Sequence, residues 1–185
     1  MKIIPLFQSE ENQIKKAQRN DSAAEKWLFE KYSPLMLSIC RNYIKDLHYA
    51  EDVMITGFTR VFDNLSKFRF EGSFEGWVRK IMVREAISFI RSRKEIYFSE
   101  IDQAEYKITA EESDLDLEQL QWLIDALPDG YRTVFLMYAV DGYSHKEIAE
   151  TLEISESTSK SQLFKARKAI QQQLNDLKAK EHGRI

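Results

Sequence analysis

The feature that most constrains the fold of this chain is a charged stretch, residues 95–114, which interrupts an otherwise helical pattern. It has no sustained spacing of apolar side chains, which is typical of a linker. Loops longer than about 15 residues are uncommon inside one compact domain, so a surface loop within a single domain is the weaker interpretation. The sequence therefore predicts two domains, at 1–94 and 115–185.

The charge of the chain is unevenly distributed. Residues 95–130 contain eleven acidic side chains and one lysine, a local charge of -10, whereas the whole chain carries -3. The other 149 residues therefore carry +7. An acidic total does not exclude contact between these flanking parts and phosphate groups.

Composition excludes several classes of protein. No apolar run approaches the roughly 18 residues that span a bilayer, and the N-terminus turns acidic too soon for a secretion signal, so we expect a soluble cytoplasmic protein without membrane insertion. The only cysteine, Cys40, lies in a helical apolar series and is expected in the core. The three histidines are scattered away from any ligand cluster, so we expect no metal and no cofactor.

The first domain is predicted to contain three main helices. Ser33 followed by Pro34 is typical of a helix N-cap and first turn, and apolar residues then recur to Ile44. A second helix is expected over about 49–65. A third is expected to begin at Ser73, with apolar side chains at helical spacing along it.

The third helix also has a basic face. Its members recur every three or four residues, so they line one side of the helix: Lys80, Arg84, Ser88 and Arg91. A charged stripe by itself is usually only a solvated face. Here it adjoins the aromatic segment KFRFEGSFEGW, residues 67–77. Basic groups can contact phosphates, and neighbouring aromatic rings can stack on unpaired bases. This combination favours binding of single-stranded nucleic acid. The alternative for the rings, above all for Phe74, is packing in the core.

The second domain is predicted to hold a helix-turn-helix. One helix from residue 117 stops at Pro128-Asp129-Gly130, and another over 131–140 ends at Gly142, which can adopt a left-handed cap. Ser144 and Glu147 then have the spacing of a capping box.

A turn is expected at 153–155, followed by a longer helix, and the small Ala149 allows the two helices to approach closely. The second helix of such a pair enters the major groove of DNA. A hairpin that serves only packing is the alternative.

Both domains together resemble a known family. LPDGYRTVFLMYAVDGYSHKEIAETLEISESTSKSQLFKARKAI, residues 127–170, is similar to the promoter-binding domain of bacterial RNA polymerase sigma factors of the extracytoplasmic-function (ECF) class. YAEDVMITGFTRVFDNLSKFRFEGSFEGWVRKIMVREAISFIRSRK, residues 49–94, resembles the polymerase-binding helix and the promoter-melting helix of the same family. The two patterns stand in the order that the family has.

The resemblance implies an all-α protein with two small helical domains joined by an acidic linker, the C-terminal one a helix-turn-helix. The implied function is that of a sigma factor, not an enzyme, which binds core RNA polymerase and directs promoter-specific initiation. Residues 1–94 would bind polymerase, melt the promoter and recognise the minus-ten element, and residues 115–185 would recognise the minus-thirty-five element. Promoter DNA and core polymerase are the implied partners. The family also suggests an anti-sigma factor, which no residue here demonstrates.

The resemblance also implies site residues. Those expected at the minus-thirty-five element are Ser155, Ser157, Thr158, Lys160, Ser161, Gln162, Lys165, Arg167 and Lys168. Those expected to hold the single-stranded minus-ten element are Phe68, Phe70, Trp77, Lys80, Arg84, Ser88 and Arg91. Those expected to bind polymerase are Asp52, Ile55, Thr56, Thr59, Arg60 and Asp63.

The chain departs from the family pattern within these sites. Arg84 and Ser88 stand where asparagine and aspartate are common, and Ile55-Thr56, followed by Gly57, replaces a Gln-Glu pair. In the helix-turn-helix the departures are Ser157 and Ser159 for glycine and valine, and Gln162 and Lys165 for arginines. The preferred promoter sequence therefore stays open.

Two other classes of function were weighed. A stand-alone helix-turn-helix regulator would bind duplex DNA without polymerase, but the basic and aromatic third helix suits a single strand better. A helical nuclease would need a cluster of acids or a nucleophile with its base, and the acids here lie mostly in the linker. The charge of -10 further suggests that the linker occupies a basic channel of the polymerase in place of nucleic acid.

Overall fold

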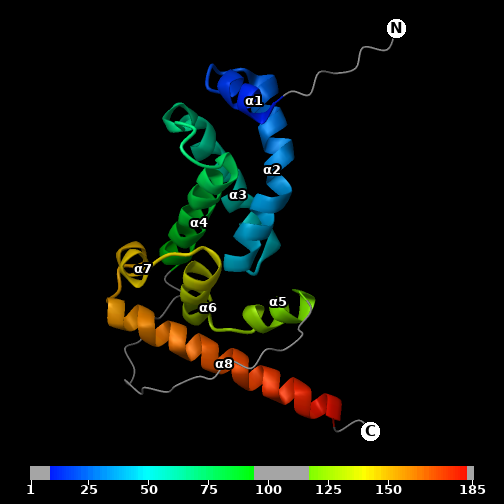
Figure 1. Ribbon diagram of the computed structural model, residues 1–185, viewed down its shortest axis with the longest axis vertical. Coiled ribbons are helices and arrows are strands. Elements are labelled where there is room, and N and C mark those ends of the chain that lie inside the picture. Colours follow the sequence, from blue (N-terminus) through cyan, green and yellow to red (C-terminus); the bar gives the residue numbers. More distant parts are fainter. Residues whose placement is uncertain (1–8, 94–116, 183–185) are drawn as a thin grey trace. The chain divides into compact units, whose positions relative to one another are not determined.

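The computed structural model describes residues 9–93 and 117–182, and every regular element in these ranges is helical. The prediction of an all-α chain is confirmed. The chain divides into two compact units, Met1–Phe89 and Ile90–Ile185 (Figure 1), and each is described by itself. The predicted linker lies outside the described residues, so the domain bounds stay a prediction.

The first unit contains helices α1 (Glu10–Ala17), α2 (Ser22–Tyr43), α3 (Leu47–Asp63) and α4 (Phe74–Ser92), with a short 3-10 turn, η1 (Leu65–Lys67), after α3. The last three residues of α4 lie past the bound at Phe89. Side-chain oxygens cap the helix starts by accepting backbone N–H groups that lack a partner within the helix. The capping residues are Ser9, Asp21, Asp46 and Ser73. The start at Ser73 was predicted, whereas α3 begins two residues before the expected position.

Helix α2 corrects the prediction that a helix begins at Ser33-Pro34. It begins at Ser22, directly after the N-cap Asp21, and runs without a break through Pro34. Proline inside a helix removes one hydrogen bond and costs about 3 kcal/mol. An apolar face that is buried on both sides of the proline, from Leu28 to Met36 and beyond, offsets that cost. Helix α1 was not predicted at all, because it is short and mostly polar.

The core of the first unit forms where α2, α3 and α4 meet. Aromatic rings pack edge to face between these helices. The ring centroids of Phe29 in α2 and Phe58 in α3 are 4.7 Å apart. Those of Tyr32 in α2 and Phe74 in α4 are 5.5 Å apart. Cys40 is fully buried among them, as predicted. Burial raises the pKa of its thiol to about 12, so the thiol stays protonated.

The second unit contains α5 (Leu117–Asp125), α6 (Asp129–Phe135), a π-helical turn η2 (Leu136–Val140), α7 (His145–Leu152) and α8 (Glu156–His182). Gly142 has φ 74° and ends the α6–η2 segment, as predicted. The helix was expected to begin at Tyr131, but it begins at Asp129, whose carboxylate lies 2.8 Å from the buried guanidinium of Arg132. Every element contributes buried apolar side chains, which include Leu123 of α5, Val134 of α6, Leu136 of η2, Ile148 of α7 and Leu163 of α8.

The described residues contain neither a membrane-spanning helix nor a cluster of metal ligands. Within the ranges 9–93 and 117–182, no helix combines the length and the apolar character needed to cross a membrane. In the same part of the chain, no three His, Cys, Asp or Glu side chains gather into a group that could hold a metal ion.

Candidate nucleic-acid interface

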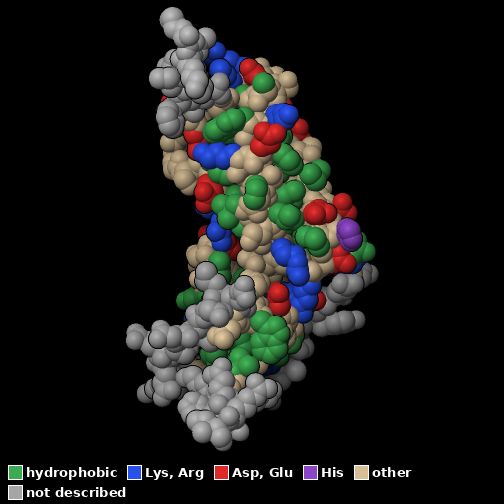
Figure 2. Space-filling view, turned by 90° about the vertical axis from the view of Figure 1, so that its right-hand side faces the viewer, with side chains coloured by type: hydrophobic (Ala, Val, Ile, Leu, Met, Phe, Trp, Pro, Cys, Tyr) green, Lys and Arg blue, Asp and Glu red, His purple; other side chains and the backbone are tan. Residues whose placement is uncertain are grey.

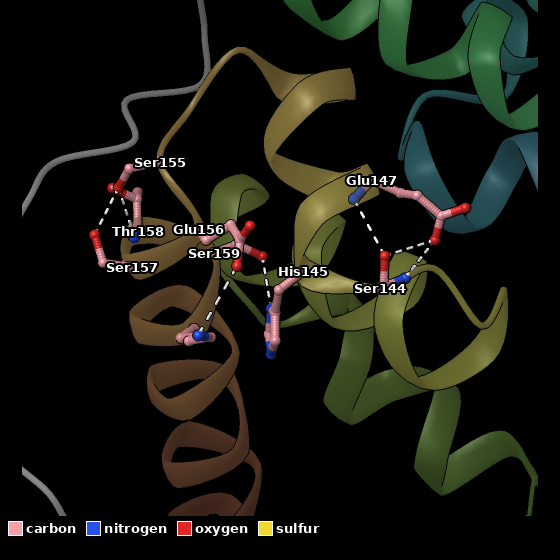
Figure 3. A network of polar contacts seen from close by, with 9 residues as sticks. Ser144, His145, Glu147, Ser155, Glu156, Ser157, Thr158 and Ser159 are labelled. Atoms are coloured by element: carbon pink, nitrogen blue, oxygen red, sulfur yellow. Dashed lines mark hydrogen bonds and ion pairs between the residues drawn. The ribbon is translucent and has the colours of Figure 1, made fainter.

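Helix α7 begins with the predicted capping box (Figure 3). The backbone N–H of Glu147 donates to Ser144 Oγ at 3.2 Å, and the backbone N–H of Ser144 donates to Glu147 Oε2 at 2.8 Å. Two backbone donors are thereby satisfied by two side chains. This pairing fixes where α7 starts, and with it the first half of the helix-turn-helix.

Hydrogen bonds also fix the turn between α7 and α8. Glu153 has φ 57°, a left-handed conformation at the end of α7, and the backbone N–H of Ile154 donates to Ala149 O at 3.1 Å. Ser155 then caps α8, because its Oγ accepts the backbone N–H of Thr158 at 3.0 Å. The hydroxyls of Ser157 and Thr158 each lie 2.7 Å from the same Oγ, as Figure 3 shows.

The residues predicted to contact the minus-thirty-five element differ in their exposure to solvent. Thr158 and Gln162 are buried, with 7% and 3% of their surface exposed. This burial leaves little of either side chain at the surface, and their contact with DNA stays a prediction. The exposed members of the predicted set are Ser155, Ser157, Lys160, Arg167 and Lys168, and Ser161 and Lys165 are half-buried. Three of the four cations in this set, Lys160, Arg167 and Lys168, are therefore exposed.

His145 is a residue that the sequence did not single out. Its Nδ1 lies 2.9 Å from Ser159 Oγ, its ring stacks on Tyr138 with centroids 4.7 Å apart, and Arg167 lies 5.7 Å from the centroid of the Tyr138 ring. Burial lowers the pKa of His145, and the charge of Lys160 lowers it further. A neutral His145 thus ties the start of α7 to the fully buried Ser159 of α8. The pair is 14 residues apart, so no local sequence pattern could reveal it.

In the first unit, the predicted basic stripe lies on the surface of α4. Lys80, Arg84, Ser88 and Arg91 are all exposed, whereas Val78, Met82, Val83 and Ala86 on the other side are buried. The helical spacing read from the sequence therefore separated the two faces correctly.

The aromatic segment before α4 divides into core and surface. Phe68 is only 6% exposed, and its ring centroid lies 5.2 Å from that of Phe74 and 5.5 Å from that of Trp77. This packing leaves little of the Phe68 ring at the surface, and its stacking on a base stays a prediction. Phe70 is 39% exposed and Trp77 is half-buried, so both rings reach the surface.

Trp77 lines two pockets at the surface. A pocket of about 340 Å³ is lined by Lys67, Phe68, Arg69, Glu71, Gly72, Ser73, Gly76, Trp77 and Lys80. A second, of about 330 Å³, is lined by Arg60, Asn64, Lys67, Trp77, Ile81, Arg84 and Glu85. Both pockets are lined by cationic side chains. The indole ring of Trp77 forms part of the wall of each. This arrangement can hold an anionic backbone next to a stacked base.

The predicted polymerase-binding residues share one side of α3. All six, Asp52, Ile55, Thr56, Thr59, Arg60 and Asp63, are exposed and follow helical spacing. Arg60 is placed by Glu85 of α4, with Nε 3.4 Å from Oε1. Ile55 is 51% exposed. Figure 2 shows one face of the molecule, on which hydrophobic side chains lie between scattered acidic and basic ones.

Two family models match the chain in succession. The Sigma-70 region 2 model matches residues 28–96, and the Sigma-70, region 4 model matches residues 117–170. They match about two thirds of the chain, with the basic stripe and Trp77 in the first match and the helix-turn-helix in the second. The chain belongs to the sigma-70 family.

Known sigma factors are similar along almost the whole chain. The ECF RNA polymerase sigma factor SigW of Bacillus subtilis is 28% identical over 179 residues, which cover 89% of this chain and 96% of that protein. The RNA polymerase sigma-H factor of Pseudomonas aeruginosa is 26% identical over 188 residues, which cover 93% and 97%. Both sigma-70 regions and this full-length similarity agree with the ECF class inferred from the sequence.

Solved structures show the same fold. CnrH in complex with the cytosolic domain of CnrY has a TM-score of 0.50 and 18% identity, covering 89% of this chain and 96% of that one. The sigma factor RpoE in complex with the anti-sigma factor NepR, from Bartonella quintana, has a TM-score of 0.51 and 18% identity, covering 81% and 96%. Helix α1 and the first residues of α2 precede the region 2 match.

Proposed function

We propose that this sigma-70 family protein binds core RNA polymerase and directs it to promoters, where it helps to open the DNA. The observation that carries the proposal is that one chain combines two surfaces that suit different forms of DNA. One is the exposed stripe of α4 beside the two pockets at Trp77, and the other is the helix-turn-helix of α7 and α8. A duplex regulator needs only the second.

The first surface suits an opened minus-ten element. The exposed cations Lys80 and Arg84 would contact phosphates, and the ring of Trp77 would stack on a base that has left the duplex. Extruding a base costs a few kcal/mol, and contacts inside a pocket can offset this cost. Phe70 adds a second exposed ring. Strand capture of this kind needs no catalytic side chain, so we propose that bond formation is left to the polymerase and that the protein itself is not an enzyme.

The second surface suits the minus-thirty-five element as a duplex. Helix α8 would lie in the major groove, with Ser157 and Lys160 near its N-terminal end and Arg167 further along. The buried Thr158 and Gln162 would then support the helix instead of contacting bases.

The exposed side of α3 is proposed to bind core polymerase. It combines a large apolar side chain, Ile55, with the charged Asp52 and Arg60 around it, and such a mixture is common in protein interfaces. The action is proposed to take place in the cytoplasm, where the polymerase works. An anti-sigma factor is a further proposed partner, since RpoE was solved with one.

The polymerase surface can be tested by direct binding to purified core polymerase. Ile55→Arg together with Thr59→Arg should weaken binding at least tenfold, because two long charged side chains then replace the centre of the contact. The matched control is Leu35→Arg on α2, which makes the same kind of change at a side chain that is 40% exposed. Equal binding by the α3 double variant and the control would remove α3 from the proposal.

The strand-capture surface can be tested in the assembled holoenzyme with a single-stranded minus-ten oligonucleotide. Trp77→Ala should weaken binding by about 1–3 kcal/mol, the usual contribution of one stacked base. Trp122→Ala is the control, because Trp122 is 59% exposed in the other unit. Unchanged affinity of the Trp77 variant would show that this ring is only a core residue.

A further inference from the structure

The loop between α3 and α4 is held in place by a residue that lies outside the region 2 match. Gln18 stands at the end of α1, and its Nε2 donates to the carbonyl oxygens of Leu65 and Phe68, at 3.0 Å each. A glutamine side chain has two N–H donors on this nitrogen. Both are therefore directed at one loop, 47 and 50 residues away in the sequence.

Helix α1 contacts the same loop a second time. Lys15 Nζ lies 5.5 Å from the ring centroid of Phe70, and its position is set by an ion pair of 2.5 Å with Glu11. Phe70 has φ 61°, a left-handed conformation that is unusual for a bulky side chain. Such a conformation persists only where the surrounding structure enforces it. Gln18 and Lys15 supply contacts of that kind.

The loop held by Gln18 forms one wall of the pocket at Trp77. Lys67, Phe68 and Gly72 come from the loop, whereas Trp77 and Lys80 on the opposite wall come from α4. The buried ring of Phe68, from the loop, contacts the ring of Trp77, from α4, with centroids 5.5 Å apart. Any movement of the Phe68 backbone would therefore change the width of the pocket.

We propose that Gln18 is a positioning residue for capture of the opened minus-ten strand, which acts by fixing the carbonyls of Leu65 and Phe68 and hence the wall of the pocket at Trp77. The inference rests on the proposed function of that pocket. A wall that is fixed before binding loses little freedom when the strand enters, and this raises affinity. The part of the chain that precedes the region 2 match thus contributes to promoter opening through the loop.

If Gln18 served only to attach α1, the loss of any other attachment of α1 would weaken strand capture as much as the loss of Gln18. Helix α1 is attached to α2 independently, through the ion pair of Glu10 with Lys31. Loss of the Gln18 amide should therefore release the loop but leave α1 in place. Lys31→Met removes this ion pair, a different attachment of α1, and leaves both Gln18 bonds intact, so it serves as the matched control.

The test compares Gln18→Leu, Lys31→Met and the native protein, each assembled with core polymerase. Leucine keeps a similar size but has no donor. Affinity for the single-stranded minus-ten oligonucleotide should fall about tenfold in Gln18→Leu, the usual effect of losing two hydrogen bonds, and open-complex formation on duplex promoter should fall with it. Affinity for core polymerase and for minus-thirty-five duplex should stay within twofold. Lys31→Met should match the native protein in every assay.

Hydrogen exchange in the free full-length protein provides a second measurement that does not depend on DNA. In Gln18→Asn, whose shorter side chain cannot reach both carbonyls, the amides of residues 68–72 should exchange at least fivefold faster, with the amides of α2 and α3 unchanged. The inference is overturned if Gln18→Leu captures the strand as the native protein does, if Lys31→Met loses as much, or if polymerase binding falls equally. If the native holoenzyme itself binds no single strand, the proposed function fails, and this inference fails with it.

Discussion

Gly57 of α3 lies directly against Met82 of α4. A Cβ atom built at Gly57 would lie 2.3 Å from Met82 Sδ and 3.0 Å from its methyl carbon, and Met82 is fully buried. The glycine therefore allows α3, with the proposed polymerase surface, to pack closely on α4, with the proposed strand-binding stripe. The sequence presented Gly57 only as a departure from the family pattern; the structure gives it a packing role.

This contact predicts a strong coupling between the two positions. Gly57→Ala should destabilise the first unit by about 1–3 kcal/mol through overpacking, even though alanine favours a helix by about 1 kcal/mol. Met82→Ala should cost about 2–5 kcal/mol through a cavity. The double variant should cost less than the sum by at least about 1 kcal/mol, since the new methyl group enters the space left by the sulfur. Urea unfolding measures all three, and strict additivity would contradict the contact.

The capping box of α7 predicts a measurable loss of stability. Ser144→Ala removes the acceptor for the Glu147 N–H and should lower the free energy of unfolding of the second unit by about 1 kcal/mol. Hydrogen exchange of the α7 and α8 amides in the full chain reports this value. Glu150→Ala, at an exposed position within α7, should change it by no more than about 0.5 kcal/mol. Equal effects of the two substitutions would show that the cap does not matter.

His145 predicts a dependence of stability on pH. Its pKa is lowered from the ordinary value of 6.5 by burial first and then by Lys160 and Arg167, against an opposite effect of Glu156, and Tyr138 stacks on the ring. The unfolded chain therefore binds a proton at a higher pH than the folded one. The stability contributed by neutral His145 is complete above pH 6.5 and falls as the pH falls from there toward the lowered pKa.

The check is the difference between the native protein and His145→Gln, measured by hydrogen exchange of the second unit from pH 7.5 to 5. The native protein should lose stability relative to the variant as the pH falls. A constant difference over this range would mean that His145 has the same pKa in both states. Comparison with the variant cancels the contributions of the other ionisable groups, which are the same in both proteins.

The charges of α8 predict a change in salt dependence. Lys160→Ala and Arg167→Ala should each weaken binding of holoenzyme to duplex carrying the minus-thirty-five element. Each should also reduce the slope of log affinity against log salt concentration by about one unit, because one phosphate contact is lost. Lys26→Ala is the control, since Lys26 is an exposed lysine of α2 in the other unit. An unchanged slope would place these two side chains away from phosphate.

Much of the fold could be predicted because it depends on local patterns. Patterns of three or four neighbouring residues determine the capping box at Ser144, the left-handed conformation of Gly142 and the start of α4 at Ser73. The faces of α3 and α4 followed from helical spacing. Pro34 misled the prediction for α2, because a strong local signal was outweighed by burial along the whole helix.

The parts that could not be predicted depend on contacts distant in sequence. Nothing near Phe68 indicates that its ring is buried between Phe70, Phe74 and Trp77. Nothing near Gln18 points to the loop that it holds. Gln162 and Thr158 were assigned to DNA by their place in a motif, and their burial follows from how α8 packs on the other helices of its unit.

The central claim is tested most directly by run-off transcription from fragments of the source genome with purified core polymerase, with and without this protein. The account predicts transcripts with discrete start sites that require both the protein and the polymerase, and that are lost with the α3 double variant Ile55→Arg, Thr59→Arg. No protein-dependent transcript from any fragment, together with tight binding of duplex DNA in the absence of polymerase, would contradict it.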